Sequence, residues 1–343
     1  MKKAYARAGV DVDLGNKVKK GIQALVQSTH SPAVLGKIGG FGGLYNAKFP
    51  GYKNPVLVSS VDGVGTKLKV ATLTNRHDTI GQDLVNHCVN DIAVIGAEPL
   101  FFLDYIGTGR LDPDVFKQIL KGLSKACAAC GCALVGGETA QMPGVYHGED
   151  YDLVGCIVGI VDRSKMLDGR SIKPGDVIIG LPASGLHTNG FSLAREILFN
   201  KCGFKVGDTI PGSRETVGSA LLKVHVNYLP TLRKLHAKVK IKGLAHITGG
   251  GLIDNLPRVL PENAQAVIQL GSWPISPFFR FLAEESHVGD DELYQVYNMG
   301  IGMTVIVSPA DAEKVLKLTK SYRIGSIVKG PRGVKLQPST KKK

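Results

Sequence analysis

The chain has 343 residues, a length that favours two domains. Its contents of 43% hydrophobic and 21% charged residues are ordinary for a globular protein and exclude a disordered chain, although glycine, with 43 residues, is nearly twice as frequent as usual. The net charge of +13 raises the question of a nucleic-acid partner. Because no run of 18 apolar residues and no apolar signal region is present, we expect a soluble, cytoplasmic chain with no membrane contact.

Apolar stretches alternate with helical patterns along the chain. In the first half we expect a strand at Pro55–Val61, a helix at Asp78–Gly96, a strand at Leu100–Ile106, a helix at Pro113–Ala129, and strands at Ala133–Val135 and Leu153–Val161. After a polar connection we expect a strand at Asp176–Leu181, a helix at Ser192–Leu198, a long helical region from about Glu215 to His236, strands at Ala266–Leu270 and Met303–Val307, and a helix at Pro309–Lys317. This order predicts an α/β (α+β) fold with two domains, residues 1–168 and 169–343.

The location of the positive charge argues against a nucleic-acid groove. Between Lys314 and Lys343 there are ten Lys and Arg residues and no Asp or Glu, which leaves +3 for the rest of the chain. A nearly neutral body with one basic end differs from a basic groove with interleaved aromatic residues. We therefore expect no specific nucleic-acid partner, and a mobile end at Lys341–Lys343.

Three of the six cysteines, Cys127, Cys130 and Cys132, lie close together in the sequence. A closed zinc site needs four ligands, and no second CxxC or HxxxH motif is present to complete one. Asp112 and Gly131 fit the two ends of a helix, which would place two of these thiols on one face of its last turn. We expect buried, reduced thiols.

Glycine-rich loops carry the candidate chemistry. The chain has neither a complete Walker A loop nor a GxGxxG motif directly after a strand. Instead, charged residues stand beside glycine in Asp62-Gly-Val-Gly-Thr-Lys67, Asn90-Asp91 and Gly136-Gly-Glu-Thr139. Glycine lets backbone N–H groups approach an anion, and Lys67 can supply a positive charge to a phosphate oxygen.

Carboxylates near such loops suit magnesium, which proteins commonly hold with one or two carboxylates and the phosphates of a substrate. We interpret Asp62, Asp91 and Glu138 as the magnesium ligands. The alternatives are an ordinary Asp-Gly turn at Asp62 and a carboxylate on a helix surface at Asp91.

Two histidines stand beside small polar residues and glycine. His187 lies in Ser184-Gly-Leu-His-Thr-Asn-Gly190, and His246 precedes Thr248-Gly-Gly-Gly251. An imidazole near a phosphate cradle can act as an acid, a base or a charge stabiliser. The alternative is a histidine that is only held by hydrogen bonds, and we assign the other seven histidines, including His87 and His225, to that class.

The motifs together carry a resemblance that covers about residue 5 to about residue 330. They are Tyr5–Asp13, Gly39–Gly43, Asp62–Lys67, Cys88–Asp91, Gly96–Tyr105, Gly136–Ala140, Met142–Gly144, Tyr146–Asp150 and His246–Gly251. In combination they resemble the aminoimidazole ribonucleotide synthetase family, the phosphoribosylformylglycinamidine cyclo-ligases.

This resemblance implies an ATP-dependent ligase of purine biosynthesis that uses Mg²⁺. The family converts formylglycinamidine ribonucleotide and ATP to 5-aminoimidazole ribonucleotide, ADP and phosphate, through phosphorylation of the formamide oxygen. It also implies a homodimer, in which the N-terminal, ATP-binding sheets of two subunits form a barrel-like core, with a C-terminal α/β domain in each subunit. The alternatives are another phosphoryl-activating member of the superfamily, or a non-catalytic member, which should have lost the acids or glycines that are present here.

The resemblance also assigns roles to particular residues. Catalytic roles go to His246, Lys67 and His187. Contacts with ATP or the substrate go to Gly39, Gly40, Gly42, Gly43, Asp62, Gly63, Gly65, Thr66, Lys67, Asp91, Gly137, Glu138, Asn189, Gly190, Thr248, Gly249 and Gly250.

Overall fold

The computed structural model describes residues 9, 10 and 12–338. The chain divides into two compact units, the first formed by residues 1–92 and 97–164 and the second by residues 93–96 and 165–343. The sequence predicted a boundary between residues 168 and 169, and the division at residue 164 lies a few residues before it. The motif at Tyr5–Asp13 and the Lys341–Lys343 end lie wholly or largely outside the described residues.

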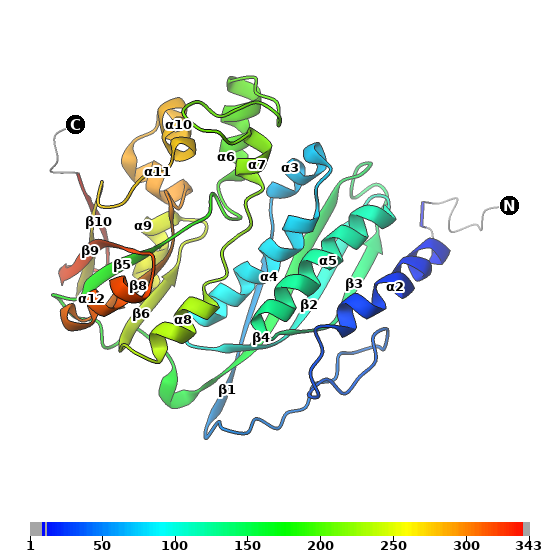
Figure 1. Ribbon diagram of the computed structural model, residues 1–343, viewed down its shortest axis with the longest axis horizontal. Coiled ribbons are helices and arrows are strands. Elements are labelled where there is room, and N and C mark those ends of the chain that lie inside the picture. The colour runs from blue at the N-terminus through cyan, green and yellow to red at the C-terminus, as the bar shows by residue number, and fades with distance from the viewer. Residues whose placement is uncertain (1–8, 11, 339–343) are drawn as a thin grey trace. The chain divides into compact units, whose positions relative to one another are not determined.

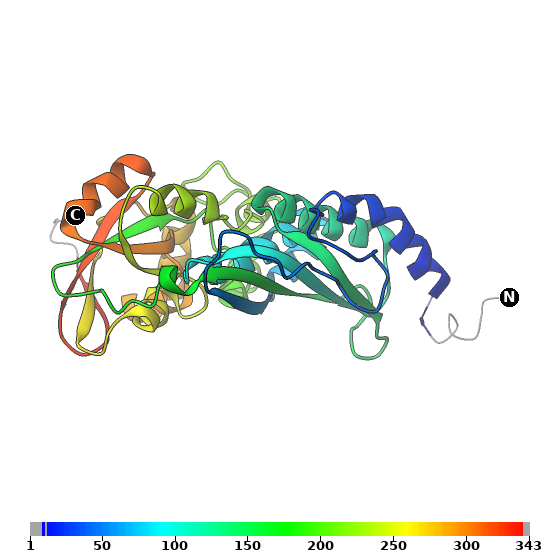
Figure 2. The ribbon, with the colours of Figure 1, turned by 90° about the horizontal axis from the view of Figure 1, so that it is seen from below.

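The first unit is built on a four-stranded sheet with the order β1-β4-β2-β3 (Figure 1). Its elements are α2 (Val12–Gln27), β1 (Pro55–Gly63), α3 (Lys67–Thr74), α4 (Asp78–Ala93), β2 (Glu98–Thr108), α5 (Pro113–Cys130), β3 (Ala133–Gln141) and β4 (Tyr151–Asp162). β4 pairs antiparallel with both β1 and β2, and β2 pairs parallel with β3. α4 and α5 cover one face of this sheet, and α2 lies beside α5 (Figure 2).

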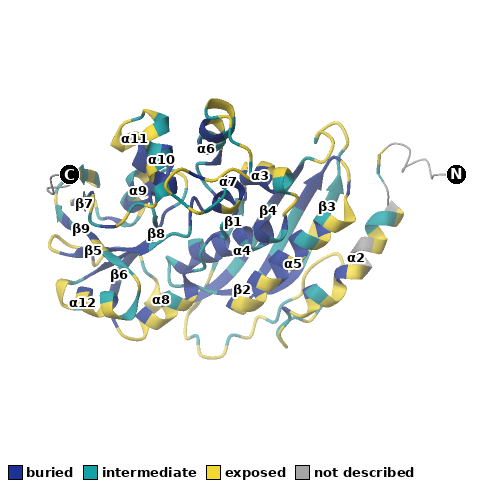
Figure 3. Cartoon of the chain, turned by 45° about the horizontal axis from the view of Figure 1, so that its top comes forward, coloured by how far each residue is buried: buried dark blue, intermediate teal, exposed yellow. Residues whose placement is uncertain are grey.

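Local signals place α5 where the sequence predicted a helix. The Asp112 carboxylate accepts hydrogen bonds from the backbone N–H groups of Asp114 and Val115, Pro113 occupies the first turn, and Gly131 ends the helix at a φ of 76°. Buried and exposed residues lie on opposite sides of α5 (Figure 3). Its last-turn cysteines, Cys127 and Cys130, are buried thiols that form no disulfide, as predicted.

The other face of the four-stranded sheet exposes apolar side chains. Along β1 exposed and half-buried residues alternate, and Leu57 and Val61 are 61% and 65% exposed. Within the described residues these strands form an open sheet rather than a closed barrel.

The second unit contains a six-stranded sheet with the order β10-β7-β9-β5-β8-β6, antiparallel except for the β10–β7 pair. Its elements are β5 (Val177–Pro182), α6 (Phe191–Arg195), α7 (Val217–Leu221), α8 (Leu229–His236), β6 (Ile241–His246), α9 (Gly251–Asn255), β7 (Ala264–Gln269), α10 (Pro277–Ser286), α11 (Asp290–Val296), β8 (Ile301–Val307), α12 (Pro309–Leu318), β9 (Tyr322–Lys329) and β10 (Gly333–Gln337). Short 3₁₀ turns lie at Arg163–Lys165 and Leu256–Val259, and α6 continues as a π-helical segment at Glu196–Lys201. α12 packs on β5 and β9 beside α8.

Two expectations about the second unit were wrong. The predicted helical region from Glu215 to His236 is two short helices, α7 and α8, joined by non-helical residues 222–228, because Pro230 suits the first turn of a new helix rather than the interior of a long one. The basic region from Lys314 onward is not a tail: through Gln337 it forms the second half of α12 and all of β9 and β10, and five of its ten basic residues lie on these elements. None of the helices in the described part of the chain is long and apolar enough to cross a membrane.

Candidate functional site

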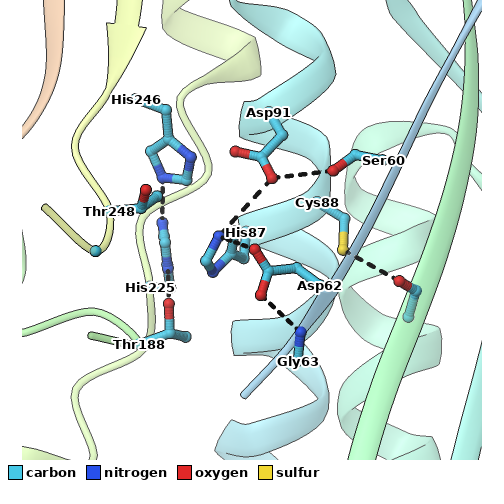
Figure 4. A network of polar contacts seen from close by, with 12 residues as sticks. Ser60, Asp62, Gly63, His87, Cys88, Asp91, Thr188, His225, His246 and Thr248 are labelled. Atoms are coloured by element: carbon cyan, nitrogen blue, oxygen red, sulfur yellow. Dashed lines mark hydrogen bonds and ion pairs between the residues drawn. The ribbon is translucent and has the colours of Figure 1, made fainter. Parts of the chain in front are cut away.

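In the first unit, two predicted magnesium ligands meet around a buried histidine. Asp62 lies near the end of β1 and Asp91 lies in α4. The His87 Nε2 atom is 2.8 Å from Asp62 Oδ2 and 3.8 Å from Asp91 Oδ2. Ser60 Oγ donates a hydrogen bond of 3.1 Å to Asp91, and the Gly63 N–H donates one of 2.7 Å to Asp62 (Figure 4).

The charges around His87 favour its protonated, cationic form, which lies buried beside the more exposed carboxylates of Asp62 and Asp91. Burial by itself lowers the pKa of His87, but the hydrogen bond that its ring donates to Asp62 and the charges of Asp91, Asp62 and Asp83 outweigh it and raise that pKa above its ordinary value. The imidazole is 2% exposed, whereas the side chains of Asp62 and Asp91 are 40% and 25% exposed. The arrangement therefore offers two accessible carboxylates, the hard oxygen donors that Mg²⁺ prefers.

His87 was missed in the sequence, where it was assigned to the class without a function. The signal was its spacing of four residues from Asp91 on one predicted helix, which places both side chains on the same face.

Lys67 does not reach a phosphate-binding surface. Its side chain is fully buried, and its Nζ atom lies 2.7 Å from Asp83 Oδ2, which is equally buried. Burial lowers the pKa of Lys67, and the charge and hydrogen bond of Asp83 oppose that shift. We therefore correct the direct phosphate contact assigned to Lys67: the structure gives it an ion pair in the core.

Glu138 is not part of the carboxylate pair. It lies on β3, at the opposite edge of the sheet from β1, with β4 and β2 between them. At about 4.8 Å per strand, roughly 14 Å separates the two edges. Glu138 is exposed and accepts a hydrogen bond of 2.7 Å from the N–H of Thr139. The three acids therefore do not converge on one ion within this chain.

Around these acids, the glycines have distinct roles. Gly65, at a φ of 65°, turns the chain between β1 and α3, where Thr66 precedes the first helical residue. Gly137 faces Asp104 so closely that a Cβ atom would clash, and burial raises the pKa of Asp104 to about 7. Gly39–Gly43 forms an exposed loop, which touches β3 through Gly43 against Val135.

In the second unit, the two predicted histidine loops come together. His246 ends β6, and His187 lies in the loop between β5 and α6. His225, which the sequence analysis did not select, lies between them: its Nε2 atom is 2.9 Å from His246 Nε2, and its ring stacks on His187 with centroids 4.0 Å apart. All three are buried.

The glycines that follow His246 lie close to their neighbours, and this leaves little room for larger residues to replace them. Gly250 has a φ of 92°, and a Cβ atom there would clash with Asp254. A Cβ atom at Gly249 would lie 3.4 Å from the amide of Asn189, which places the loop at Asn189-Gly190 beside the loop at Thr248–Gly250. The Asn255 amide donates hydrogen bonds to the carbonyls of Gly249 and Gly251, at 3.1 and 2.8 Å, and fixes the shape of the loop.

Comparison with known families defines the class of this protein. The family model of the AIR synthase related protein, N-terminal domain, matches residues 49–161, and that of its C-terminal domain matches residues 173–335. Together these matches span most of the chain and both units.

Near-full-length relatives define the family more closely. The chain is 51% identical over 312 residues to the phosphoribosylformylglycinamidine cyclo-ligase of Geotalea uraniireducens (strain Rf4), covering 91% of this chain and 90% of that protein. It is 48% identical over 335 residues to the protein of the same name from Geobacillus kaustophilus (strain HTA426), covering 96% and 97%. The chain belongs to the phosphoribosylformylglycinamidine cyclo-ligase family.

Solved structures with lower identity share the fold. Thiamine-monophosphate kinase from Stenotrophomonas maltophilia K279a has a TM-score of 0.69 at 19% identity, covering 93% of this chain and 96% of its own. The hydrogenase maturation protein HypE in complex with ATP has a TM-score of 0.66 at 18% identity, covering 93% and 91%. These likenesses confirm the mixed α/β architecture.

Proposed function

We propose that this chain converts formylglycinamidine ribonucleotide and ATP to 5-aminoimidazole ribonucleotide, ADP and phosphate, in the cytoplasm. The formamide oxygen is a poor leaving group, so it first takes the γ-phosphoryl group of ATP. The amidine nitrogen then attacks the activated carbon, the ring closes, and the oxygen leaves as phosphate. The observation that carries this proposal is the identity of about 50% with cyclo-ligases along nearly the whole chain.

Asp62 and Asp91 are the proposed ligands of Mg²⁺. Their accessible oxygens fit a hard cation, which would neutralise phosphate charge when bound. His87 fixes the orientation of Asp62 through its 2.8 Å contact. Because Glu138 lies at the far edge of the sheet, we propose that it makes a separate contact with ATP, as part of a different set of ligands.

In the second unit, His246 is the proposed stabiliser of the transferring phosphoryl group. Thr248–Gly250 and the loop from His187 to Gly190 are the proposed substrate contacts, since glycine leaves their backbone accessible to an anion. In the first unit, the exposed Gly39–Gly43 loop is a further proposed substrate contact. Positioning and electrostatic stabilisation are the main needs of phosphoryl transfer, and these residues supply donors for it.

We also propose a homodimer. The open face of the four-stranded sheet exposes Leu57 and Val61, and a second copy of this face would cover them in a self-complementary, two-fold arrangement. A barrel-like core would then arise from two subunits.

One assay tests the reaction. The purified protein is incubated with ATP, Mg²⁺ and formylglycinamidine ribonucleotide, and release of ADP and appearance of aminoimidazole ribonucleotide are measured together. Thiamine monophosphate and selenide serve as competing substrates. ADP release with either of these, and none with formylglycinamidine ribonucleotide, would replace the proposal with another phosphoryl-activating activity. Nucleotide binding without turnover of any substrate would favour a non-catalytic member.

A further inference from the structure

Three histidines of the second unit lie together out of contact with water, and the proposed reaction uses only two of them. The exposed fractions of His187, His225 and His246 are 1%, 1% and 6%. They come from three separate segments: the loop after β5, the connection between α7 and α8, and the end of β6. His225 therefore occupies a central position that no step of the proposed reaction explains.

The short contact between His225 and His246 restricts which ring nitrogens of the two histidines carry a proton. Their Nε2 atoms are 2.9 Å apart, a hydrogen-bond distance, so one nitrogen donates and the other accepts. On the far side of the His225 ring, the Thr188 hydroxyl lies 3.5 Å from Nδ1 (Figure 4). The ring of His225 thus stands between a hydroxyl and the imidazole of His246.

His187 restricts the orientation of His225. The backbone N–H groups of Ser184 and Val226 point to His187 Nε2 from 3.3 and 3.5 Å, so this nitrogen carries no proton and the ring is neutral with its proton on Nδ1. This neutral ring stacks on His225 with an interplanar angle of 22°. Because His187 is neutral, it can stack on His225 without charge repulsion. This stacking keeps the His225 ring in the orientation in which its Nε2 atom faces His246.

The same stacking argues against a metal ion on the three rings. Imidazole binds a metal through a lone pair in the plane of the ring, and ligands of one ion must converge on it. Nearly parallel rings that lie one above the other direct their lone pairs side by side, so His187 and His225 do not converge.

We propose that His225 is a positioning residue for His246, and this inference rests on the proposed function of His246. His225 donates its Nε2 proton to His246 Nε2. His246 must then carry its own proton on Nδ1 and presents an N–H donor to an oxygen of the transferring phosphoryl group. With the opposite arrangement, neutral His246 would present a lone pair to an anion, which repels it.

Two substitutions separate this role from simple packing. His225→Leu keeps the approximate volume and removes the donor, whereas His225→Gln keeps an N–H donor on the side chain. We expect kcat of the Leu variant to fall about tenfold to hundredfold, with KM for both substrates changed less than about threefold, because the lost hydrogen bond supports a charged contact in the transition state. The Gln variant should stay within about threefold of the unsubstituted enzyme. His236→Gln, on the exposed end of α8, is the matched control and should leave both constants unchanged.

A second readout does not depend on turnover. In protein with ¹⁵N-labelled histidine, long-range ¹H–¹⁵N correlation spectra distinguish the two neutral forms of His246. We expect the Nδ1–H form in the unsubstituted protein and in the Gln variant, and a mixture in the Leu variant. This result would support the role of His225 even if the protein failed to act on formylglycinamidine ribonucleotide, which would contradict only the proposed function.

Several results would overturn the inference. An Nε2–H form of His246 in the unsubstituted protein would reverse the direction of the hydrogen bond. Equal losses of kcat in the Leu and Gln variants, or no loss in either, would show that the donor of His225 is not what matters. One equivalent of a transition metal in the purified protein, removed together with activity by a chelator, would assign the three rings to a metal instead. If the Leu variant does not fold, the spectrum of the unsubstituted protein and the Gln variant still decide the question.

Discussion

The ion pair of Lys67 and Asp83 predicts a large loss of stability on replacing the lysine. Lys67→Met retains most of the side-chain volume but removes the ion pair with Asp83, and neither side chain has any exposed surface. Removing one partner of a buried pair costs about 3–5 kcal/mol, because the remaining charge is buried without compensation. We expect a loss of this size in the free energy of unfolding of the first unit.

An exposed ion pair of similar length provides the control. Lys69 Nζ lies 2.6 Å from Asp150 Oδ1, but these side chains are 47% and 37% exposed, so Lys69→Met should cost less than about 1 kcal/mol. The double variant Lys67→Met/Asp83→Leu should recover much of the loss, since apolar replacement of a whole buried pair is often neutral or stabilising.

The assay must report on the first unit. The single tryptophan, Trp273, belongs to the second unit, so its fluorescence does not suffice. Urea unfolding followed by far-ultraviolet circular dichroism, together with hydrogen exchange of the α4 amides, measures the relevant stability. If Lys67→Met left this stability within about 1 kcal/mol of the unsubstituted protein and abolished ATP-dependent turnover, the lysine would act on phosphate and the reasoning from burial would be refuted.

Three further predictions concern the proposed site, the dimer and the basic end. Asp62→Asn removes a proposed Mg²⁺ ligand and Glu138→Gln removes a proposed contact with ATP. Each should lower turnover at least about a hundredfold with little change in the unfolding midpoint, since charge stabilisation of phosphoryl transfer is worth several kcal/mol; near-normal turnover would make these acids turn formers only. Light scattering should give a mass of about twice 36.5 kDa, and Leu57→Lys/Val61→Lys should shift it toward the monomer; a monomeric unsubstituted protein at micromolar concentration would contradict this. Deleting Pro338–Lys343 should leave turnover and its salt dependence unchanged, because the motifs that can hold phosphate lie between Gly39 and Gly251; a rate lost only at low salt would show that this segment steers substrate.

The sequence was sufficient to predict the helices and strands that are specified by local features, such as helix-capping residues or an apolar run. Asp112 and Gly131 bound α5 at both ends, and the apolar runs of β1 and β4 indicated strands that the structure confirms. In contrast, β6 reads Ile-Lys-Gly-Leu-Ala-His, a weak pattern that becomes a strand through its pairing with β8. β9 and β10 were also missed. In β9 the alternation is interrupted at Gly325-Ser326, and β10 alternates Val334 and Leu336 with Lys335 over only five residues.

In the candidate site, too, the sequence indicated individual residues, whereas their contacts depend on the fold. The motifs indicated Asp62, Asp91, His187 and His246, but they contained no information on which residues meet in space. Lys67 follows a glycine loop and so was interpreted as a phosphate ligand, yet its partner lies sixteen positions further on, in α4, and determines its burial. His225 sits between two valines, and only the fold places it against His246.

The strand order of the first unit has a consequence for how the chain folds. β4 is the last strand of its sheet to be synthesised, yet it occupies a central position and is the neighbour of both β1 and β2. β1 must wait for a partner that is about a hundred residues away, from Pro55 to Asp162 at one end of the ladder. Such non-local pairing slows folding and prolongs the exposure of unpaired edges. During synthesis, the apolar β1 segment therefore remains unpaired, and prone to aggregation, until β4 has been made.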